Sequence, residues 1–194
     1  MQTDVVMTGI GGQGIQLAAK TLATGAIEEG RQAMLSAHWG GEMRGGQTEA
    51  SVAISDGRLR ALPILPSISS AFVMHPKFWA PVLARLKPGA PVVVNSDLVE
   101  DLDVLDGRLF SIPATAIASS IGAPMGAGFV LLGAYCAVTG LVGLDALVAA
   151  MKRLVPPYRT QHIVANESCL RAGGEAGPAR AAPVWSVDAP EVSA

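Results

Sequence analysis

Asp4-Val-Val-Met-Thr-Gly-Ile-Gly-Gly-Gln-Gly14 joins an apolar run to a glycine-rich loop, and a stretch with helical periodicity follows it as far as Gly30. The apolar run has the continuous hydrophobic character of a strand that is covered on both faces of a sheet. Gly30 is a typical residue to end the helix. A strand, a tight glycine turn and a helix in this order predict the first unit of an α/β fold.

Strand and helix patterns continue to alternate along the chain. Further strands are expected over residues 33–37, 47–55, 70–75, 91–95 and 109–113, and further helices over 76–86, 114–121, 128–139, 144–154 and 158–171. The pattern predicts one α/β domain over residues 1–172, layered α/β/α around a mainly parallel sheet. Residues 173–194 are rich in Ala, Pro and Gly and are expected to form an extended C-terminal tail.

The composition favours some classes of protein and excludes others. Half of the residues are apolar, only 15% are charged, and the net charge is −2, so much of the surface is expected to be covered by partner proteins. This charge offers no basic surface for nucleic acid. Two cysteines and three isolated histidines predict neither a disulfide framework nor a metal site, which fits a reducing cytoplasm.

One uncharged segment is a candidate for a transmembrane helix. Residues 109–144 carry no formal charge and are long enough to span a bilayer. Pro113 and Pro124 interrupt the segment, Gly, Ala, Ser and Thr dilute it, and basic or aromatic flanks are missing. A buried or subunit-interface helix is therefore favoured over a transmembrane one.

Two glycine-rich loops predict a phosphate site. In the first, Gly11, Gly12, Gln13 and Gly14 can turn backbone N–H groups toward an anion at the start of the following helix. The second, over residues 36–46, supplies a permanent cation in Arg44, which is followed by Gly45 and Gly46. Each loop has a structural alternative: the first can be a tight packing turn, and Glu42 can simply pair with Arg44.

Two common nucleotide motifs do not fit. The glycines are too closely spaced for the standard dinucleotide fingerprint, and Ser36 stands where that motif places an acidic ribose ligand. A Walker A loop is excluded because no Gly-Lys-Ser/Thr sequence closes the turn. Polar residues also follow two other strands, at His75 and at Asn95-Ser-Asp97, where turn and capping chemistry is the favoured interpretation.

The two loops resemble those of a known family, the gamma subunit or domain of 2-oxoacid:ferredoxin oxidoreductases. Gly9-Ile-Gly-Gly-Gln-Gly-Ile15 is similar to the opening motif of that family. The resemblance covers most of residues 3–170, including the strand at 51–55 and the helix around Gly133. The second family motif is matched at Ser36, Trp39, Gly40, Glu42, Arg44, Gly45 and Gly46.

The resemblance implies a multi-subunit enzyme that oxidatively decarboxylates a 2-oxoacid to an acyl-CoA and passes the electrons to ferredoxin or another low-potential acceptor. It places thiamine diphosphate with Mg²⁺ and the iron–sulfur clusters in partner subunits, named alpha, beta and a ferredoxin-like delta. This chain would contribute to assembly and to binding of coenzyme A, with no catalytic residue of its own. The family acts on pyruvate, 2-oxoglutarate, branched-chain oxoacids, indolepyruvate and aryl-glyoxylates.

The resemblance implies that Gly11, Gly12, Gln13 and Gly14 face a CoA phosphate, with Arg44 opposite and Ser36 and Glu42 as secondary contacts. Two other functions stay open from the sequence. One is a free-standing Rossmann-like enzyme that binds NAD(P) through the first loop. The other is a purely structural subunit that uses both loops to dock its neighbours.

Overall fold

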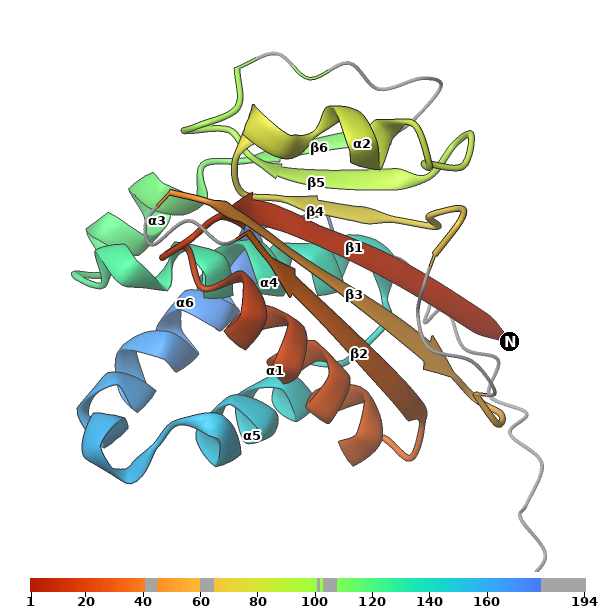
Figure 1. Cartoon of the computed structure of the whole chain (residues 1–194). Helices are drawn as coiled ribbons and strands as arrows, with labels where there is room; N and C mark the ends of the chain where they lie inside the picture. Colours follow the sequence, from red (N-terminus) through yellow and green to blue (C-terminus); the bar gives the residue numbers. More distant parts are fainter. Residues whose placement is uncertain (41–44, 60–64, 101, 103–107, 179–194) are drawn as a thin grey trace, which may run out of the picture.

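The chain forms a six-stranded mixed sheet with helices on both faces (Figure 1). This computed structural model describes residues 1–40, 45–59, 65–100, 102 and 108–178 of the 194-residue chain. The strands lie in the order β2-β3-β1-β4-β5-β6. Their bounds are β1 Gln2–Ile10, β2 Gln32–Trp39, β3 Gln47–Ser55, β4 Ala71–Val73, β5 Pro91–Asn95 and β6 Arg108–Ile112.

Parallel and antiparallel pairing divide the sheet into two halves. β1, β4, β5 and β6 run parallel to one another, whereas β3 is antiparallel to both β1 and β2. Three of the five pairings are therefore parallel. The β2–β3 pair is antiparallel because only residues 40–46 separate the two strands, which is too short for the crossover that a parallel pair needs. The α/β class is confirmed, with an antiparallel edge on the predicted parallel sheet.

The helices form unequal layers. In Figure 1, α1 and α4 lie against one face of the sheet, with α5 and α6 outside them, while the short α2 lies on the opposite face. None of the helices in the described part of the chain has the length and apolar character that crossing a membrane requires. Their bounds are α1 Ile15–Glu28, α2 Ala80–Leu83, α3 Ala114–Ser120, α4 Ala127–Thr139, α5 Leu144–Leu154 and α6 Ile163–Ala176, with 3-10 turns η1 Pro76–Phe78, η2 Pro124–Gly126 and η3 Pro157–His162.

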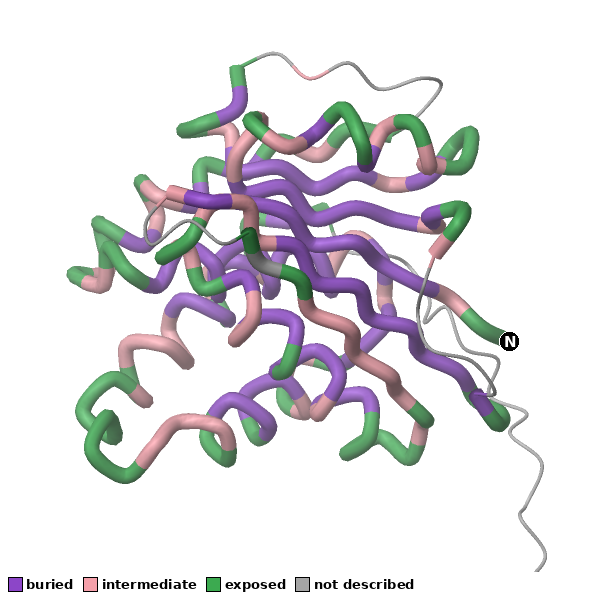
Figure 2. The backbone as a smooth tube through the Cα atoms, in the orientation of Figure 1, coloured by how far each residue is buried: buried purple, intermediate pink, exposed green. Residues whose placement is uncertain are grey.

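The alternation of side chains along β1 creates two separate cores. Val5 and Met7 point into the larger core beneath α1 and α4, and Val6 points into a smaller core that Trp79 and Val82 cover from the side of α2. Figure 2 shows the resulting buried backbone through the middle of the sheet. Burial on both faces explains the continuous apolar run that the sequence shows at this strand.

Two predicted boundaries are corrected. The helix expected over residues 76–86 is broken into η1 and α2, because Pro81 has no N–H and cannot continue a regular helix through this segment. At the C-terminus, α6 runs to Ala176, so residues 173–176 belong to a helix and not to the expected tail. The remainder of the tail, residues 179–194, lies outside the described residues.

Candidate functional site

The first glycine loop lies at the carboxyl end of β1 and leads directly into α1. Gly12 has φ 101° and Gly14 has φ 76°, both in the left-handed region that L side chains avoid. Gly14 is the N-cap residue of α1, and no side chain of the described residues caps the helix. A Cβ added to Gly12 or Gly14 would meet no heavy atom within 4 Å. The backbone here is therefore both unusual in conformation and open on its outer side.

Local contacts fix the shape of this loop. The Gln13 side chain folds back, and its Oε1 accepts a hydrogen bond from the Ile10 N–H at 2.9 Å. The Gln13 N–H donates to the Ile10 carbonyl at 3.2 Å. The side chain and the N–H of Gln13 thus both brace the loop, which leaves the N–H groups of Gly12 and Gly14 as the candidates for a ligand.

The second loop meets the first. The Gly11 N–H donates to the Gly46 carbonyl at 3.0 Å, and a Cβ on Gly11 would lie 3.8 Å from the Gly45 nitrogen. Gly45 itself has φ 69°. On the neighbouring helix turn, Gln16 Nε2 donates to the Glu49 carbonyl at 3.1 Å. The beginning of β3 is therefore attached to the first loop and to the first turn of α1.

Of the other three predicted site residues, the structure describes only Ser36. Glu42 and Arg44 lie outside the described residues. Ser36 lies inside β2, three residues before its end, directly opposite Ser51 of β3. Its neighbour Leu35 packs toward the α1 core, so strand alternation directs Ser36 to the opposite face of the sheet. The structure thus does not bring Ser36 to the open side of the first loop.

The other polar strand ends have structural roles, as the sequence favours. Asn95 Oδ1 accepts from the Ala114 N–H at 3.1 Å, and Asp97 Oδ2 accepts from the Ala116 N–H at 2.8 Å, so these two side chains cap α3. His75 Nδ1 accepts from the Lys77 N–H at 3.1 Å and caps η1. In the described part of the chain, the N-terminus of α1 has no equivalent side chain, which leaves its first N–H groups for another acceptor.

A polar row crosses the other face of the sheet close to this edge. His38, Glu49 and Thr8 stand opposite one another in register on β2, β3 and β1. Arg85 pairs with Glu49 at 3.1 Å, and Thr8 Oγ1 is fully buried without a hydrogen-bond partner among the described residues. Sequence reasoning missed this row and Gln16, because the pairing register that aligns them is a tertiary property.

The arrangement is suited to binding rather than to covalent chemistry. The uncapped start of a helix and left-handed glycines present backbone N–H groups, which is how proteins bind phosphate and carboxylate. The cavity beside the loop, between Gly14, Met125 and Phe129, measures about 40 Å³. That volume holds little more than one water molecule, so a phosphate would lie on the outer surface of the loop.

A family model described as pyruvate ferredoxin/flavodoxin oxidoreductase matches residues 4–176. The chain belongs to this family. The match includes most of β1 and all the other strands and helices of the described residues, and it confirms the resemblance that the two glycine loops carry.

Individual members of the family align over most of their length. The 2-oxoglutarate synthase subunit KorC of Methanothermobacter marburgensis is 31% identical over 183 residues, which cover 90% of this chain and 96% of the relative. The crystal structure of the keto/oxoacid ferredoxin oxidoreductase gamma subunit from Geobacter sulfurreducens superposes with a TM-score of 0.76 at 30% identity, covering 89% of this chain and 96% of that one.

A larger oxidoreductase contains the same fold as one part. The 2-oxoglutarate:ferredoxin oxidoreductase of Magnetococcus marinus, solved with 2-oxoglutarate, coenzyme A and succinyl-CoA, matches with a TM-score of 0.80 at 17% identity. The match covers 94% of this chain and 33% of that one. This chain thus has the architecture of the gamma part of 2-oxoacid oxidoreductases.

Proposed function

We propose that this chain is the gamma subunit of a 2-oxoacid:ferredoxin oxidoreductase and that its first glycine loop binds a phosphate group of coenzyme A. The reaction of the complex is the oxidative decarboxylation of a 2-oxoacid to an acyl-CoA. The chain binds and positions the CoA, and the catalytic groups belong to other subunits. Relatives of this chain are named as subunits of 2-oxoglutarate synthase and pyruvate synthase, which supports the reaction class.

The open, uncapped N-terminus of α1 is the observation that carries the CoA proposal. Among the described residues, no side chain caps the N–H groups of Gly12, of Gly14 or of the first turn of α1. CoA carries a diphosphate and a 3′-phosphate, and an anion at a helix N-terminus is stabilised by the helix dipole and by direct N–H donation. The Gly11–Gly46 hydrogen bond supports a position for the second loop beside the same anion.

Arg44 supplies the compensating charge in this proposal. Its guanidinium is always ionised and can donate two parallel hydrogen bonds to phosphate oxygens. Gly45 and Gly46, which follow it, leave space for a close approach of the ligand to the backbone. Ser36 and Glu42 remain secondary candidates, Ser36 with less support because its strand turns it away from the loop.

The redox and carbanion chemistry is assigned to partner subunits. Thiamine diphosphate with Mg²⁺ provides the decarboxylation, and iron–sulfur clusters carry the electrons to ferredoxin. We assign these groups to alpha, beta and ferredoxin-like delta subunits in the cytoplasm. In the described part of this chain, no group of three His, Cys, Asp or Glu side chains is arranged to hold a metal ion.

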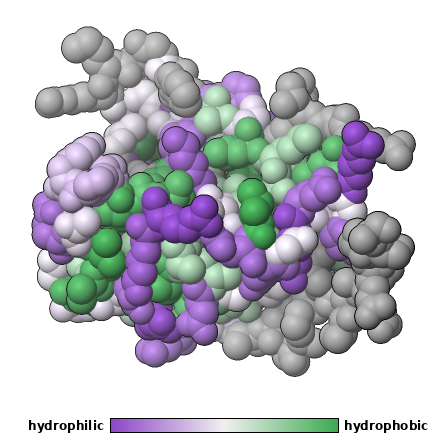
Figure 3. Space-filling model, turned by 90° about the horizontal axis from the view of Figure 1, so that it is seen from below, coloured by the Kyte–Doolittle hydropathy of each residue, from purple (hydrophilic) through white to green (hydrophobic). Residues whose placement is uncertain are grey.

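Exposed apolar side chains support a role in assembly. Met125 is 83% exposed and Val164 is 76% exposed, and Ile27 is also exposed at the end of α1. Figure 3 shows apolar patches between polar rows when the molecule is seen from below. Partner subunits would remove such apolar surface from water.

Anaerobic co-purification separates this proposal from a free-standing NAD(P) enzyme. A tagged chain expressed in its native host is expected to carry brown iron–sulfur partners and thiamine diphosphate, detected by absorbance and mass spectrometry. A colourless monomer that binds NADPH more tightly than CoA in titration calorimetry would refute the proposal.

Substitution of Arg44 separates CoA binding from a purely structural role. In the assembled complex, we expect Arg44→Ala to raise the KM for CoA roughly tenfold or more, since a charged hydrogen bond contributes about 1.5–3 kcal/mol. Arg44→Lys keeps the charge and should show an intermediate KM. Weaker assembly of the complex with an unchanged KM for CoA would assign the loop to docking instead.

A further inference from the structure

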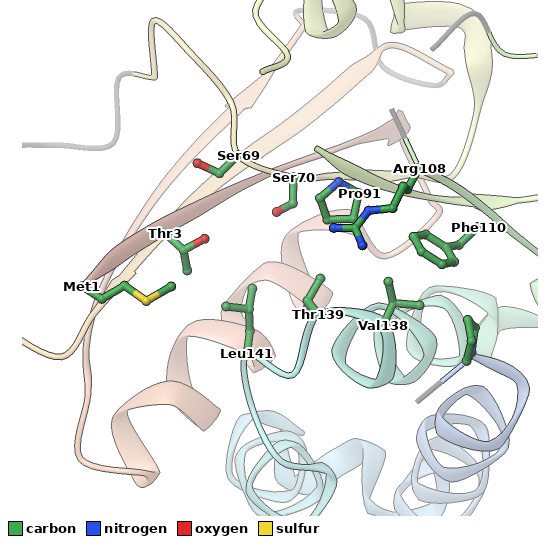
Figure 4. A pocket seen from close by; sticks show the side chains of 11 residues that line it. Met1, Thr3, Ser69, Ser70, Pro91, Arg108, Phe110, Val138, Thr139 and Leu141 are labelled. Carbon is green, nitrogen blue, oxygen red and sulfur yellow. The ribbon is translucent and has the colours of Figure 1, made fainter. Parts of the chain in front are cut away.

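A second cavity lies at the opposite edge of the sheet from the glycine loops. Its volume is about 530 Å³. Thr3, Pro91 and Arg108, which contribute to its wall, stand at the beginnings of β1, β5 and β6, and Thr139 closes it from the end of α4 (Figure 4). The first glycine loop follows the far end of β1, so the two sites are separated by the length of the strand.

We call this space the amino-edge cavity, because it lies where β1, β5 and β6 begin. One of its walls is apolar. Phe110, Val138 and Leu141 contribute side chains from β6, from α4 and from the segment after α4. Figure 4 shows Phe110 and Val138 side by side and Leu141 on the other side of Thr139. A cavity of this volume with a largely preformed apolar wall has the size and character of a small-molecule site.

The opposite wall carries a cation. In Figure 4, the Arg108 guanidinium extends beside Pro91 toward Val138 and Thr139, into the space of the cavity. Arg108 forms no ion pair with a carboxylate among the residues that the structure describes. A guanidinium without a carboxylate partner among the described residues, beside apolar side chains, favours an anionic group with an apolar substituent.

The neighbouring acid, Asp4, is held by two hydrogen bonds from Ser69. Asp4 Oδ1 accepts from the Ser69 N–H at 2.7 Å, and its Oδ2 accepts from Ser69 Oγ at 3.0 Å. Lys87 Nζ in turn donates to Ser69 Oγ at 2.9 Å. The Met1 amino group, also at the rim, pairs with Asp56. Among the described residues that line the cavity, Arg108 carries the one charged side chain.

A buried hydroxyl chain holds the floor of the cavity rigid. Ser70 Oγ donates to the Asp4 carbonyl at 2.8 Å and lies 2.8 Å from the Tyr135 hydroxyl. Because Ser70 has one hydroxyl proton, Tyr135 must donate to Ser70. Burial raises the pKa of Tyr135 far above its usual range, so this proton stays in place. The floor is thus preformed in the absence of a ligand.

We propose that the amino-edge cavity binds a small amphipathic carboxylate. The carboxylate lies on the Arg108 guanidinium, and the apolar chain or ring lies against Phe110, Val138 and Leu141. This site is independent of the proposed CoA site, because it shares no residue with either glycine loop.

Binding of hexanoate to the purified complex tests the assignment. Equilibrium dialysis with labelled hexanoate is run on the wild-type complex and on complexes carrying Arg108→Gln or the matched surface control Arg159→Gln. Since partner subunits can also bind carboxylates, the quantity compared is the change in hexanoate binding sites per gamma chain between the wild-type and variant complexes. We expect Arg108→Gln to weaken one site per chain at least tenfold and Arg159→Gln to leave all sites unchanged. The KM for CoA should be the same in all three complexes.

Two further measurements complete the test: binding of neutral hexanamide, and binding of hexanoate to a complex whose gamma chain lacks residues 179–194. Hexanamide should bind equally weakly to the wild-type and Arg108→Gln complexes, because it has no charge to pair with the guanidinium. Unchanged hexanoate binding in the Arg108→Gln complex would overturn the proposal. Binding that appears only after residues 179–194 are deleted would also overturn it, because the C-terminal segment of the chain would then be the occupant.

Discussion

Gly14 combines three properties at a single residue. It adopts a left-handed conformation, it is the N-cap of α1, and the space beyond its missing Cβ is empty. The conformation explains why the sequence has glycine here, and the empty space means that packing alone does not require it. A side chain at this position would project into the place where we propose that the CoA phosphate binds.

Two substitutions at Gly14 test whether the ligand group at this loop is negatively charged. Asn and Asp are similar in size and tolerate the left-handed region better than most residues, so Gly14→Asn and Gly14→Asp carry a similar backbone cost. A carboxylate a few ångströms from a phosphate adds about 1–3 kcal/mol of repulsion near a protein surface. We expect the KM for CoA of the Asp complex to exceed that of the Asn complex roughly tenfold. Equal KM values in two fully assembled complexes would argue against a phosphate at this loop.

The site shows how much of the local chemistry is readable from sequence. The first loop and its role as a helix start follow from Gly9-Ile-Gly-Gly-Gln-Gly14 alone, because left-handed turns require glycine. The hydrogen bond between Gly11 and Gly46 joins residues far apart in the chain and appears only when β1 and β3 pair. Ser36 was assigned to the end of its strand, but β2 continues to Trp39.

At the scale of elements, the backbones of α4 and α6 are in close contact. A Cβ on Gly133 would lie 2.0 Å from the Leu170 carbonyl oxygen, and a Cβ on Gly173 would lie 1.8 Å from the Val130 carbonyl oxygen. Neither contact can be relieved by rotating a side chain, because the obstructing atoms belong to the backbone. These two glycines therefore set the distance between the helices.

Neighbouring glycines of α6 provide a matched test of this contact. Gly173→Ala should reduce the free energy of unfolding by at least about 1–3 kcal/mol, because the two helices must move apart. Gly174→Ala meets only Leu144 side-chain atoms, at 3.4 Å or more, and should be neutral or stabilising by up to about 1 kcal/mol through helix propensity. Thermal unfolding followed by circular dichroism measures both. A similar loss in the two variants would contradict the close contact.

Element boundaries were predictable where short-range signals are strong. β3 and β5 have the predicted bounds, because Asp56-Gly57 ends the first and Lys87-Pro-Gly89 precedes the second. The helix over residues 76–86 was overestimated, since Pro81 interrupts it. The antiparallel edge was not predicted, although the short connection between residues 39 and 47 requires it.

At the scale of the whole molecule, the low charge content is partly explained by burial on both faces of the sheet. The two apolar cores and the double helical layer use much of the apolar sequence, including the uncharged stretch at residues 109–144, which contains α4. The exposed Met125 and Val164 are left for contacts outside the chain. Composition thus predicted both a large core and a surface for partners, but not the position of that surface.

The reactivity of the two cysteines measures how readily this core opens. Cys136 and Cys169 are both buried, and burial raises the pKa of each thiol above its usual value. We expect neither thiol to react with iodoacetamide at pH 8 in the native chain, and both to react in urea, as counted by mass spectrometry. Fast modification of the native chain would show that α4 and α6 separate readily.

Since the raised pKa favours the protonated form of both thiols in the folded chain, the free energy of unfolding should also fall as the pH rises above about 8.5, where the unfolded thiols ionise.

The position of CoA in the assembled complex tests the central claim most directly. A cryo-EM structure of the complex with bound CoA should show a phosphate oxygen about 2.7–3.2 Å from the N–H groups of residue 12 or of residues 14–16, with Arg44 on the other side of the phosphate. A structure in which partner side chains cover this loop and the CoA phosphates bind elsewhere would contradict the account.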